Sequence, residues 1–483
     1  MLYFVVGLIL FFNLVAIISI IFIEKKNPTS ALAWIIVLNF LPLIGFILYF
    51  FLGSSQKLRL IRKIYKLDAV EKDILEEISR DTKIKKLNKF DDLFVLNDYN
   101  FLNTVTNDND IKVYSDMNEA VGKMFKDMLN AKKTIHVSFF IFNTKSDVGR
   151  KFLEILKEKA KSGVKVRFTY DRLGSLKSRF KDFKEIIKYD GEVYKHLPSL
   201  FRTLFQSNYR NHRKMVIIDS KIAYTGGMNI SDEYLNHSKK IKPWRDTWAK
   251  IEGSSVLFIQ SKFLVDFIYL KKLTLKRKYD ENKTKKEIKE IFYPVKFNGN
   301  DTVQFVYNGP DTEYSYIRDG YLKMINDAKK SIYIVTPYFI PDEPVLEAIR
   351  LASISGVDVK VLIPGLPDKK NVYYVTLSFI TKLVECGVKV YMYDGFVHSK
   401  IIICDNEYLS FGTCNYDSRS FRLNYENNLF IKSKKTAKSM IKDFENDIKK
   451  SKQFTKKDIK SIGKLKTFIG LICRLFSPIL WQA

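Results

Sequence analysis

The chain carries one pattern of chemically active residues twice, 186 residues apart. The pattern is His-x-Lys, four residues, Asp, six residues, Gly-x-x-Asn. Its two copies consist of His212, Lys214, Asp219, Gly226 and Asn229, and of His398, Lys400, Asp405, Gly412 and Asn415. The chain has only five histidines in 483 residues, so two of them in one pattern is informative. Two imidazoles and two ammonium groups together suit nucleophilic attack on a phosphodiester.

The other three histidines lack this pattern. His237 and Lys239 also form a His-x-Lys triplet, but Trp244 occupies the position of the Asp. His136 and His196 have no partners at the motif spacing. We therefore interpret these three as ordinary packing or surface residues.

Each copy of the motif continues into a short apolar run, Met215–Ile218 or Ile401–Cys404, which predicts a buried strand. Side chains alternate along a strand, so the His and the Lys of each copy share one face. Asp219 and Asp405 break this parity, because each lies an odd number of residues from its histidine. We therefore expect these two carboxylates to be structural members of the motif that organise the turn before the glycine.

The last residues of each motif fit a phosphate. Gly226 and Gly412 allow the backbone to approach a ligand closely. Asn229 and Asn415 offer amide donors for phosphoryl oxygens.

The duplication extends beyond the motif. Residues 131–137 (Ala-Lys-Lys-Thr-Ile-His-Val) resemble residues 328–334 (Ala-Lys-Lys-Ser-Ile-Tyr-Ile), and residues 162–166 resemble residues 355–359. Amphipathic stretches between these segments, at 151–161 and 343–353, predict helices. Strands alternating with helices favour an α/β fold with a mostly parallel sheet. We predict two repeated α/β domains that pack face to face with pseudo-twofold symmetry and share one site at their interface.

Two uncharged runs, residues 2–23 and 31–52, predict a transmembrane hairpin in residues 1–53. Each run has 22 residues, and a helix of that length spans about 33 Å, more than the hydrocarbon core of about 30 Å. A cleaved signal peptide is the alternative for the first run, but that run lacks a basic amino-terminal region and a small-residue cleavage site. Five basic residues between 57 and 66 outnumber the two lysines of the connector, which predicts that the domains lie in the cytoplasm.

The remaining boundaries follow from composition. We expect a basic juxtamembrane region at 54–110, a first domain at 111–275, a charge-dense linker at 276–300, a second domain at 301–450 and a basic, amphipathic tail at 451–483. The tail either lies on the membrane surface or packs back on the domains, and the sequence favours neither arrangement.

The net charge of the chain points to an anionic partner. The chain has 81 basic and 53 acidic residues, a net charge of +28 and a pI near 9.5, which fits nucleic acid or an anionic membrane surface. With two membrane spans expected, anionic membrane lipids are the simpler partner, and we expect no nucleic acid. The four cysteines show neither a disulfide framework nor zinc-ligand spacing, which agrees with a reducing cytoplasm.

The repeated motif resembles the signature of the phospholipase D superfamily, and its surroundings resemble the bacterial cardiolipin synthase family over nearly the whole chain. The segments that carry this resemblance, besides the motifs, are residues 27–34 (Asn-Pro-Thr-Ser-Ala-Leu-Ala-Trp), 225–230, 243–247 (Pro-Trp-Arg-Asp-Thr), 336–342 (Thr-Pro-Tyr-Phe-Ile-Pro-Asp), 418–421 and 424–426. The superfamily is usually described with Gly-Ser after the six-residue gap. This chain has Gly226-Gly227 and Gly412-Thr413 instead, which weakens a role for a serine hydroxyl.

The resemblance implies two phospholipase D-like domains that transfer a phosphatidyl group from one phosphatidylglycerol to another, giving cardiolipin and glycerol. One histidine would form a phosphatidyl-histidine and the other would act as acid and base, with His212 the expected nucleophile by analogy. Lys214, Lys400, Asn229 and Asn415 would face the phosphoryl oxygens, with no metal or other cofactor required. The resemblance further implies orienting carboxylates that cross between the domains, Glu426 near His212 and Asp246 near His398.

The resemblance also implies a multi-pass protein of the bacterial cell membrane with its catalytic domains on the cytoplasmic side, and no obligatory protein partner is evident. Three alternatives stay open at this stage. The acceptor could be phosphatidylethanolamine or water, the chain could be a phospholipase D-type nuclease, or it could be a membrane-anchored scaffold that binds anionic lipid without turnover.

Overall fold

The computed structural model of the chain describes residues 2–24, 28–49, 74–75, 78, 92–100, 105–196, 209–237, 242–276, 280, 286–287, 291, 297–312 and 314–475. The connector lysines, the basic stretch at 57–66, and most of the predicted juxtamembrane region and linker lie outside these residues. The end of the predicted tail, residues 476–483, also lies outside them.

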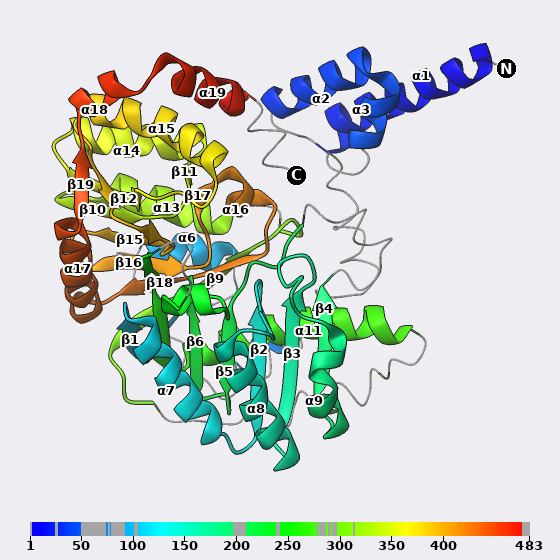
Figure 1. Ribbon diagram of the computed structural model, residues 1–483, viewed down its shortest axis with the longest axis vertical. Coiled ribbons are helices and arrows are strands. Elements are labelled where there is room, and N and C mark those ends of the chain that lie inside the picture. The colour runs from blue at the N-terminus through cyan, green and yellow to red at the C-terminus, as the bar shows by residue number, and fades with distance from the viewer. Residues whose placement is uncertain are drawn as a thin grey trace.

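One large mixed β-sheet runs through the body of the protein (Figure 1). In spatial order, its first part consists of β1 (Val105–Tyr114), β8 (Trp248–Glu252), β6 (Ile222–Gly226), β5 (Met215–Ile218), β2 (Thr134–Phe139), β3 (Lys165–Asp171) and β4 (Glu192–His196). Its second part consists of β9 (Asp301–Asn308), β18 (Glu426–Lys432), β16 (Tyr408–Gly412), β15 (Ile401–Cys404), β10 (Ser331–Val335), β12 (Asp358–Pro364) and β13 (Lys389–Tyr393), with β19 (Ser451–Phe454) at the outer edge. Strands at the same place in these two series are counterparts, so the fold repeats the duplication of the sequence.

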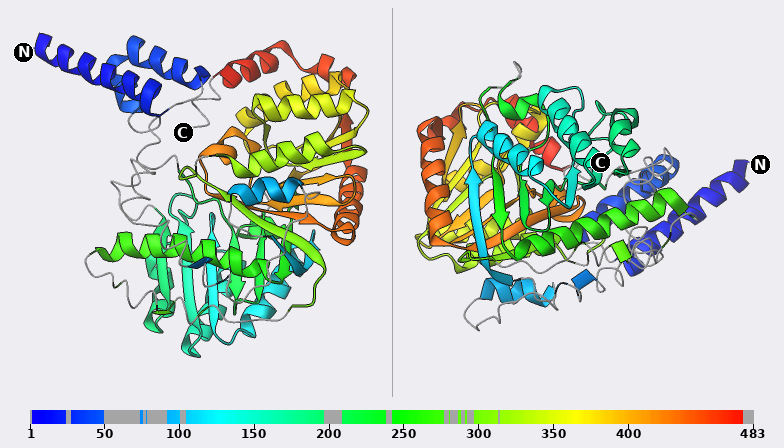
Figure 2. Two further views of the ribbon diagram at one scale, coloured as in Figure 1. Left: turned by 180° about the vertical axis from the view of Figure 1, so that it is seen from behind. Right: turned by 90° about the horizontal axis from the view of Figure 1, so that it is seen from below.

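Helices cover both faces of the sheet. One face carries α7 (Met117–Leu129), α8 (Asp147–Lys161) and α9 (Lys184–Lys188) in the first part, and α13 (Tyr316–Asp327), α14 (Glu343–Ile354) and α15 (Lys370–Glu385) in the second. The opposite face carries α11 (Ser255–Leu275) and α17 (Lys434–Lys449), which share one apolar core that spans both parts. The views from behind and from below show the two parts side by side with these helices on either face (Figure 2).

The helices predicted between the strands are confirmed as α8 and α14. Each begins at a side chain that accepts a backbone hydrogen bond, Ser146 Oγ from the N–H of Gly149 (3.1 Å) and Asp342 Oδ1 from the N–H of Val345 (3.4 Å). Such caps satisfy backbone donors that the first turn of a helix leaves unpaired.

The prediction of a mostly parallel sheet is wrong. The pairs β2–β3, β3–β4, β10–β12 and β12–β13 are parallel, and the other pairs of the large sheet are antiparallel. The reason is that each motif strand opens a tight hairpin. Asp219 and Ser220, and Asp405 and Asn406, all have φ between 52° and 58°, a left-handed conformation found in tight hairpin turns that return the chain antiparallel.

The two parts also do not pack face to face as predicted. Strand β1 pairs with β8 of its own part on one side and with β9 of the other part on the other side. The two sheets therefore join edge to edge, and the faces remain free to be covered by helices.

Helices and strands outside the predicted domain boundaries pack or pair with the two domains. Strand β1 begins at Val105, whereas the first domain was expected to begin at 111. Its polar sequence does not indicate a buried strand, but Asn109 within it is buried and hydrogen-bonded. Helix α6 (Asp92–Asn100) packs Leu93 and Phe94 into the core of the second part. Strand β19, in the predicted tail, pairs with β13.

The amino-terminal apolar segment forms helices, but not the two continuous spans expected. Helix α1 (Leu2–Ile18) continues into a π-helical turn (Ser19–Ile23), and its residues Val6–Ile23 are long and apolar enough to cross a membrane. The second run is divided into α2 (Pro28–Phe40) and α3 (Pro42–Leu48). Pro42 causes the division, since it has no N–H and disfavours a helical residue before it.

The described part of the tail packs back on the body, which is one of the two arrangements that the sequence left open. Helix α19 (Lys464–Leu475) packs on α15, with the guanidinium of Arg474 4.4 Å from the ring centroid of Phe379. Its Phe468 and Leu471 side chains nevertheless remain exposed to solvent. The helix is therefore attached to the body and presents an apolar edge outward.

Candidate active site

Each motif histidine is held by the backbone of the other part of the molecule. The N–H of His212 donates to the carbonyl oxygen of Tyr425 (3.0 Å), and the N–H of His398 donates to that of Arg245 (2.7 Å). Short parallel pairing extends both contacts, as a bridge at Tyr425 and as β14 (Phe396–Val397) on β7 (Trp244–Arg245). The site therefore exists only where the two parts meet.

These crossings deliver one carboxylate to each histidine, as predicted. Glu426 approaches Nδ1 of His212 with both oxygens, at 3.0 and 2.9 Å. Asp246 approaches Nδ1 of His398 at 2.8 Å. All four side chains are buried, with the two carboxylates fully so. Because each Nδ1 is engaged by a carboxylate, Nε2 is the nitrogen left for chemistry.

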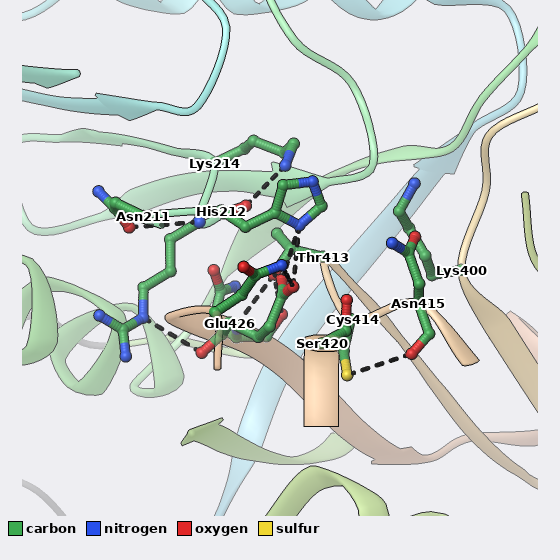
Figure 3. A network of polar contacts seen from close by, with 12 residues as sticks. Asn211, His212, Lys214, Lys400, Thr413, Cys414, Asn415, Ser420 and Glu426 are labelled. Carbon is green, nitrogen blue, oxygen red and sulfur yellow. Dashed lines mark hydrogen bonds and ion pairs between the residues drawn. The ribbon is translucent and has the colours of Figure 1, made fainter. Parts of the chain in front are cut away.

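The motif lysines line the same site. Lys214 and Lys400 are almost fully buried, and each donates from Nζ to the carbonyl oxygen of its own histidine, at 2.6 Å for Lys214. Figure 3 shows Lys214 beside His212 and Lys400 beside Asn415 across the same space. Burial lowers the pKa of both ammonium groups, to about 8 for Lys400 and well below the usual range for Lys214.

Asp219 and Asp405 lie outside the site, as their parity predicts. The carboxylate of Asp219 accepts three backbone N–H groups of residues 132–134 at 2.7 to 2.8 Å. That of Asp405 accepts three from residues 329–331 at 2.7 to 3.0 Å. Both carboxylates therefore tie the hairpin turn of the motif to the start of the neighbouring strand.

The two motif asparagines differ. Oδ1 of Asn229 accepts the N–H of Ile141 (3.0 Å), and Nδ2 donates to the hydroxyl of Tyr234 (2.7 Å), so this amide is already engaged in holding other groups. Among the described residues, Oδ1 of Asn415 is buried without a hydrogen-bond partner. Figure 3 shows Asn415 next to Lys400. Asn229 is therefore committed to contacts within the protein, whereas the amide of Asn415 beside Lys400 still has an oxygen that the described residues leave unpaired.

The residue after each motif glycine decides the surroundings of the carboxylates. A Cβ on Gly227 would lie 2.1 Å from Oδ1 of Asp246, so only glycine leaves room for that carboxylate. At the equivalent position, the hydroxyl of Thr413 donates to Oε2 of Glu426 (2.5 Å). The sequence drew attention to this position as a departure from Gly-Ser, but it did not reveal that Thr413 holds Glu426.

Burial keeps both imidazoles neutral in the protein alone. The pKa of His212 lies well below its usual range because of burial and then because of Lys214 and Lys400. Burial and Lys400 lower the pKa of His398 to about 4, although Asp246 opposes them. A phosphodiester anion placed between the lysines would favour an imidazolium, because an opposite charge nearby stabilises the charged form.

The two carboxylates respond differently to burial. Burial raises the pKa of Glu426 to about 7, although Lys214 and neighbouring hydroxyl and amide donors oppose the rise. Burial would also raise the pKa of Asp246, but the contact with His398, the charge of Lys400 and the N–H of Thr247 outweigh it, and the pKa of Asp246 is lowered. Asp246 is therefore ionised at neutral pH, whereas Glu426 is close to half-protonated.

The rings around the two histidines also differ. The ring centroid of His398 lies 5.6 Å from that of Tyr234, 5.7 Å from that of Trp244 and 6.0 Å from that of Phe396. His212 faces Phe140 at 5.0 Å. The sequence does not mark these rings as parts of the site, because an aromatic residue near a buried strand looks the same in sequence as a core residue.

No group of three histidine, cysteine, aspartate or glutamate side chains within the described ranges is arranged to hold a metal ion. What the arrangement offers instead is two oriented imidazoles, two buried cations and an amide around one space. These are the groups needed to bind a phosphodiester and to move its substituents.

Comparison with known proteins agrees with this geometry. A family model described as "Cardiolipin synthase, PLD-like domain" matches residues 124–241 and again residues 321–448, and one described as "Phospholipase_D-nuclease N-terminal" matches residues 11–54. The chain is 38% identical to a cardiolipin synthase of Clostridium perfringens, over 95% of this chain and 96% of that one. It is also 38% identical to the major cardiolipin synthase of Bacillus subtilis, over 97% of each chain.

Among solved structures, a phosphatidylserine synthase of Haemophilus influenzae matches with a TM-score of 0.57 at 16% identity, covering 77% of this chain and 94% of that one. This likeness shows a shared fold.

Proposed function

The chain belongs to the cardiolipin synthase family with phospholipase D-like domains, and we propose that it transfers a phosphatidyl group between two phosphatidylglycerol molecules. The observation that carries the proposal is the pair of facing His–carboxylate contacts, each made across the junction of the two parts. Such a pair provides both a nucleophile and an acid/base for one phosphorus atom.

In the first step, Nε2 of neutral His212 attacks the phosphorus of phosphatidylglycerol. The bond from phosphorus to the glycerol oxygen breaks, and protonated His398 gives its proton to that oxygen, so glycerol leaves. The product on the protein is a phosphatidyl-histidine. Splitting one displacement into two in this way lowers the barrier of each.

In the second step, a hydroxyl of another phosphatidylglycerol attacks the same phosphorus. His398 takes the hydroxyl proton, the bond from phosphorus to His212 breaks, and its electron pair returns to the imidazole. Cardiolipin is released, and both histidines regain their starting protonation. Lys214, Lys400 and Asn415 hold the phosphoryl oxygens, where negative charge must be stabilised.

The assignment of His212 as nucleophile is supported by the two carboxylates. Ionised Asp246 stabilises a cationic His398 and so favours it as the acid. Glu426, with a pKa near 7, stabilises a cationic His212 less and so favours a neutral imidazole there. Two groups whose environments push their proton affinities apart are typical of an acid–nucleophile pair.

We also propose that residues 2–48 cross the bacterial cell membrane twice and that the sheet lies on the cytoplasmic side. The apolar helix at Val6–Ile23 supports the first crossing. Helices α2 and α3 pack on α1 through Ala16, Ile20, Trp34 and Leu38, which supports a paired second crossing built from two shorter helices. Single-cysteine labelling of intact and permeabilised cells at positions 26 and 110 tests the orientation, since we expect position 110 to react only after permeabilisation.

The direct test of the activity uses the purified full-length protein in detergent with phosphatidylglycerol, followed by mass spectrometry of the lipids. We expect cardiolipin and glycerol in equal amounts. Phosphatidic acid as the only product would identify a hydrolase instead. Adding phosphatidylethanolamine in the same assay tests whether another acceptor competes.

A further inference from the structure

A pocket opens beside His398. It has an empty volume of about 250 Å³ that includes space open to solvent, and its walls combine prolines and apolar side chains with a few polar ones. It begins where β10 ends, at Pro337 and Tyr338, and it is closed on the opposite side by the start of α15. Phe396, which lines it, is also one of the rings packed around His398. The pocket and the surroundings of the acid/base histidine therefore share the ring of Phe396.

A hydrogen-bonded pair stands in this pocket. The hydroxyl of Tyr338 donates to Oδ2 of Asp368 at 2.6 Å, and Asp368 itself is exposed. Burial, and then the charge of Asp368, raise the pKa of the Tyr338 phenol well above its usual range, so it remains a donor. Nζ of Lys369 lies 5.8 Å from the ring centroid of Tyr338, which adds one cation at the mouth of the pocket.

This pair has no counterpart in the first part of the molecule. The equivalent of Tyr338, judged from the pairing of Phe142 with Ile230 and of Phe339 with Tyr416, is Ile141. The equivalent of Asp368, counted from the aligned strands β3 and β12, is Ser175, whose hydroxyl donates to the carbonyl oxygen of Phe140 (2.9 Å). At these equivalent positions, within the described residues, the carboxylate and the phenol therefore occur on the His398 side and not on the His212 side.

We propose that this pocket is the subsite for the glycerol headgroup, with Tyr338 and Asp368 as the groups that recognise its hydroxyls and Lys369 as the group that meets the phosphate of the acceptor lipid. The inference rests on the proposed function. A carboxylate accepts hydrogen bonds from alcohols, while the prolines and Phe396 pack against the carbon chain.

The chemistry of the reaction explains why one subsite suffices. The alcohol that leaves in the first step and the alcohol that attacks in the second are both a primary hydroxyl end of glycerol. Both must stand on the side of the acid/base histidine, opposite the nucleophile, for the displacement to be in line. The pocket lies on that side, and its occupancy by the glycerol headgroup of a second phosphatidylglycerol, in place of water, directs the intermediate toward cardiolipin.

The test is a partition experiment with the full-length protein in detergent. Phosphatidyl-p-nitrophenol is the donor, so the covalent intermediate forms without a glycerol leaving group. Free glycerol then competes with water, and mass spectrometry gives the ratio of phosphatidylglycerol to phosphatidic acid. This ratio does not depend on how much of the sample is folded or on how fast the intermediate forms.

We expect Asp368→Asn to lower this ratio about tenfold and Tyr338→Phe about threefold. With phosphatidylglycerol as acceptor, Lys369→Gln should lower the ratio of cardiolipin to phosphatidic acid more than it lowers the ratio for free glycerol, which has no phosphate. Asp358→Asn is the matched control, because Asp358 stands at the opposite end of β12 and pairs with Lys360 and Lys389.

Each outcome decides a different point. If the wild-type protein transfers to glycerol and phosphatidylglycerol, but Asp368→Asn and Tyr338→Phe keep its ratios, the subsite assignment is wrong. If Asp368→Asn lowers transfer to ethanolamine and leaves transfer to glycerol intact, the pocket recognises an ammonium group, and the assignment is again wrong. If the wild-type protein gives only phosphatidic acid, it is the proposed function that fails.

Discussion

The two parts of the molecule share the same strands and the same His-Lys motif, but they surround their histidines differently. His212 has Glu426, which Thr413 holds and whose pKa is about 7. His398 has ionised Asp246, three aromatic rings and a pocket with a carboxylate. The two copies of the motif therefore have the same reacting groups, and the residues packed around each histidine give the two histidines different roles.

Removing each histidine in turn should have the largest effect and should show which of the two is the nucleophile. With phosphatidyl-p-nitrophenol, whose leaving group needs no acid, His398→Asn should still form the phosphatidyl-protein, and the adduct should accumulate because no base activates the acceptor. His212→Asn should form none, with a loss of about 10⁴-fold or more in nitrophenol release. Intact-protein mass spectrometry and release kinetics measure both.

His237→Asn serves as the control for this pair, because His237 is exposed and belongs to a His-x-Lys triplet without the rest of the motif. If the adduct accumulates in His212→Asn and not in His398→Asn, the assignment of the nucleophile is reversed.

The carboxylates should differ in their pH dependence. Asp246 stays ionised across the neutral range, so Asp246→Asn should lower kcat by about 10²- to 10³-fold at every pH. Glu426, with its pKa raised to about 7, is protonated below that pH and ionised above it. Because the ionised form makes Nε2 of His212 more nucleophilic, the wild-type rate of intermediate formation should rise about tenfold from pH 6 to pH 8.

Glu426→Gln should abolish that rise, because a glutamine does not titrate. The measurement is the rate of nitrophenol release at pH 6, 7 and 8 for the wild type, Asp246→Asn and Glu426→Gln. A rise that persists in Glu426→Gln would assign the titration to another group.

The residues between each His and Lys should differ in what they contribute to stability. Arg213 is fully buried, pairs with Asp266 at 2.5 Å and donates to the carbonyl oxygens of Glu426 and Asn308. Arg213→Met takes a donor from the two carbonyl oxygens and leaves Asp266 with Lys262 (3.1 Å) as its remaining cation, and it should cost about 3 kcal/mol of unfolding free energy. Its counterpart Ser399 makes a hydroxyl contact to Thr247 (2.9 Å), and Ser399→Ala should cost about 1 kcal/mol.

Thermal unfolding in detergent, followed by circular dichroism, compares the two. Equal destabilisation by both variants would mean that the Arg213 ion pair adds nothing beyond a single hydrogen bond.

The last comparison concerns equivalent rings on β2 and β10. His136 stacks on Phe263 at 5.0 Å, whereas Tyr333 stacks on Phe444 at 5.1 Å. Burial, and then Arg167, lower the pKa of His136 well below its usual value. As the pH falls below about 6.5, His136 binds a proton in the unfolded chain but not in the folded one. The free energy of unfolding therefore falls, by about 2 kcal/mol at pH 5.

His136→Phe removes this loss. The melting temperature of the variant should therefore rise relative to the wild type between pH 8 and pH 5, while His237→Phe, at an exposed position, should show no such trend. An unchanged difference across this range would show that His136 takes up its proton in the folded state as well.

Much of the site could be predicted from the sequence because the motif is local. The spacing of His212 and Lys214, which stand directly before β5, predicts that both side chains face the same way, and the parity of Asp219 predicts that its side chain does not. The family resemblance supplied the pairing of Glu426 with His212 and of Asp246 with His398. The helices α8 and α14 and the duplication itself were also evident, because helical periodicity and repeated sequence segments do not depend on contacts between distant residues.

Other features depended on contacts between distant residues. The polar run of β1 gave no sign that this strand joins the two sheets at their edges, because its pairing with β9 is made across nearly 200 residues.

By itself, the sequence determined which groups react and that there are two sets of them. Only the tertiary structure decided how the sets differ. Burial raises the pKa of Glu426, whereas His398, Lys400 and the N–H of Thr247 outweigh burial and lower the pKa of Asp246. The fold also brings Tyr338 and Asp368 together beside His398. Proton affinity and ligand recognition are properties of an environment, and that environment is assembled from segments far apart along the chain.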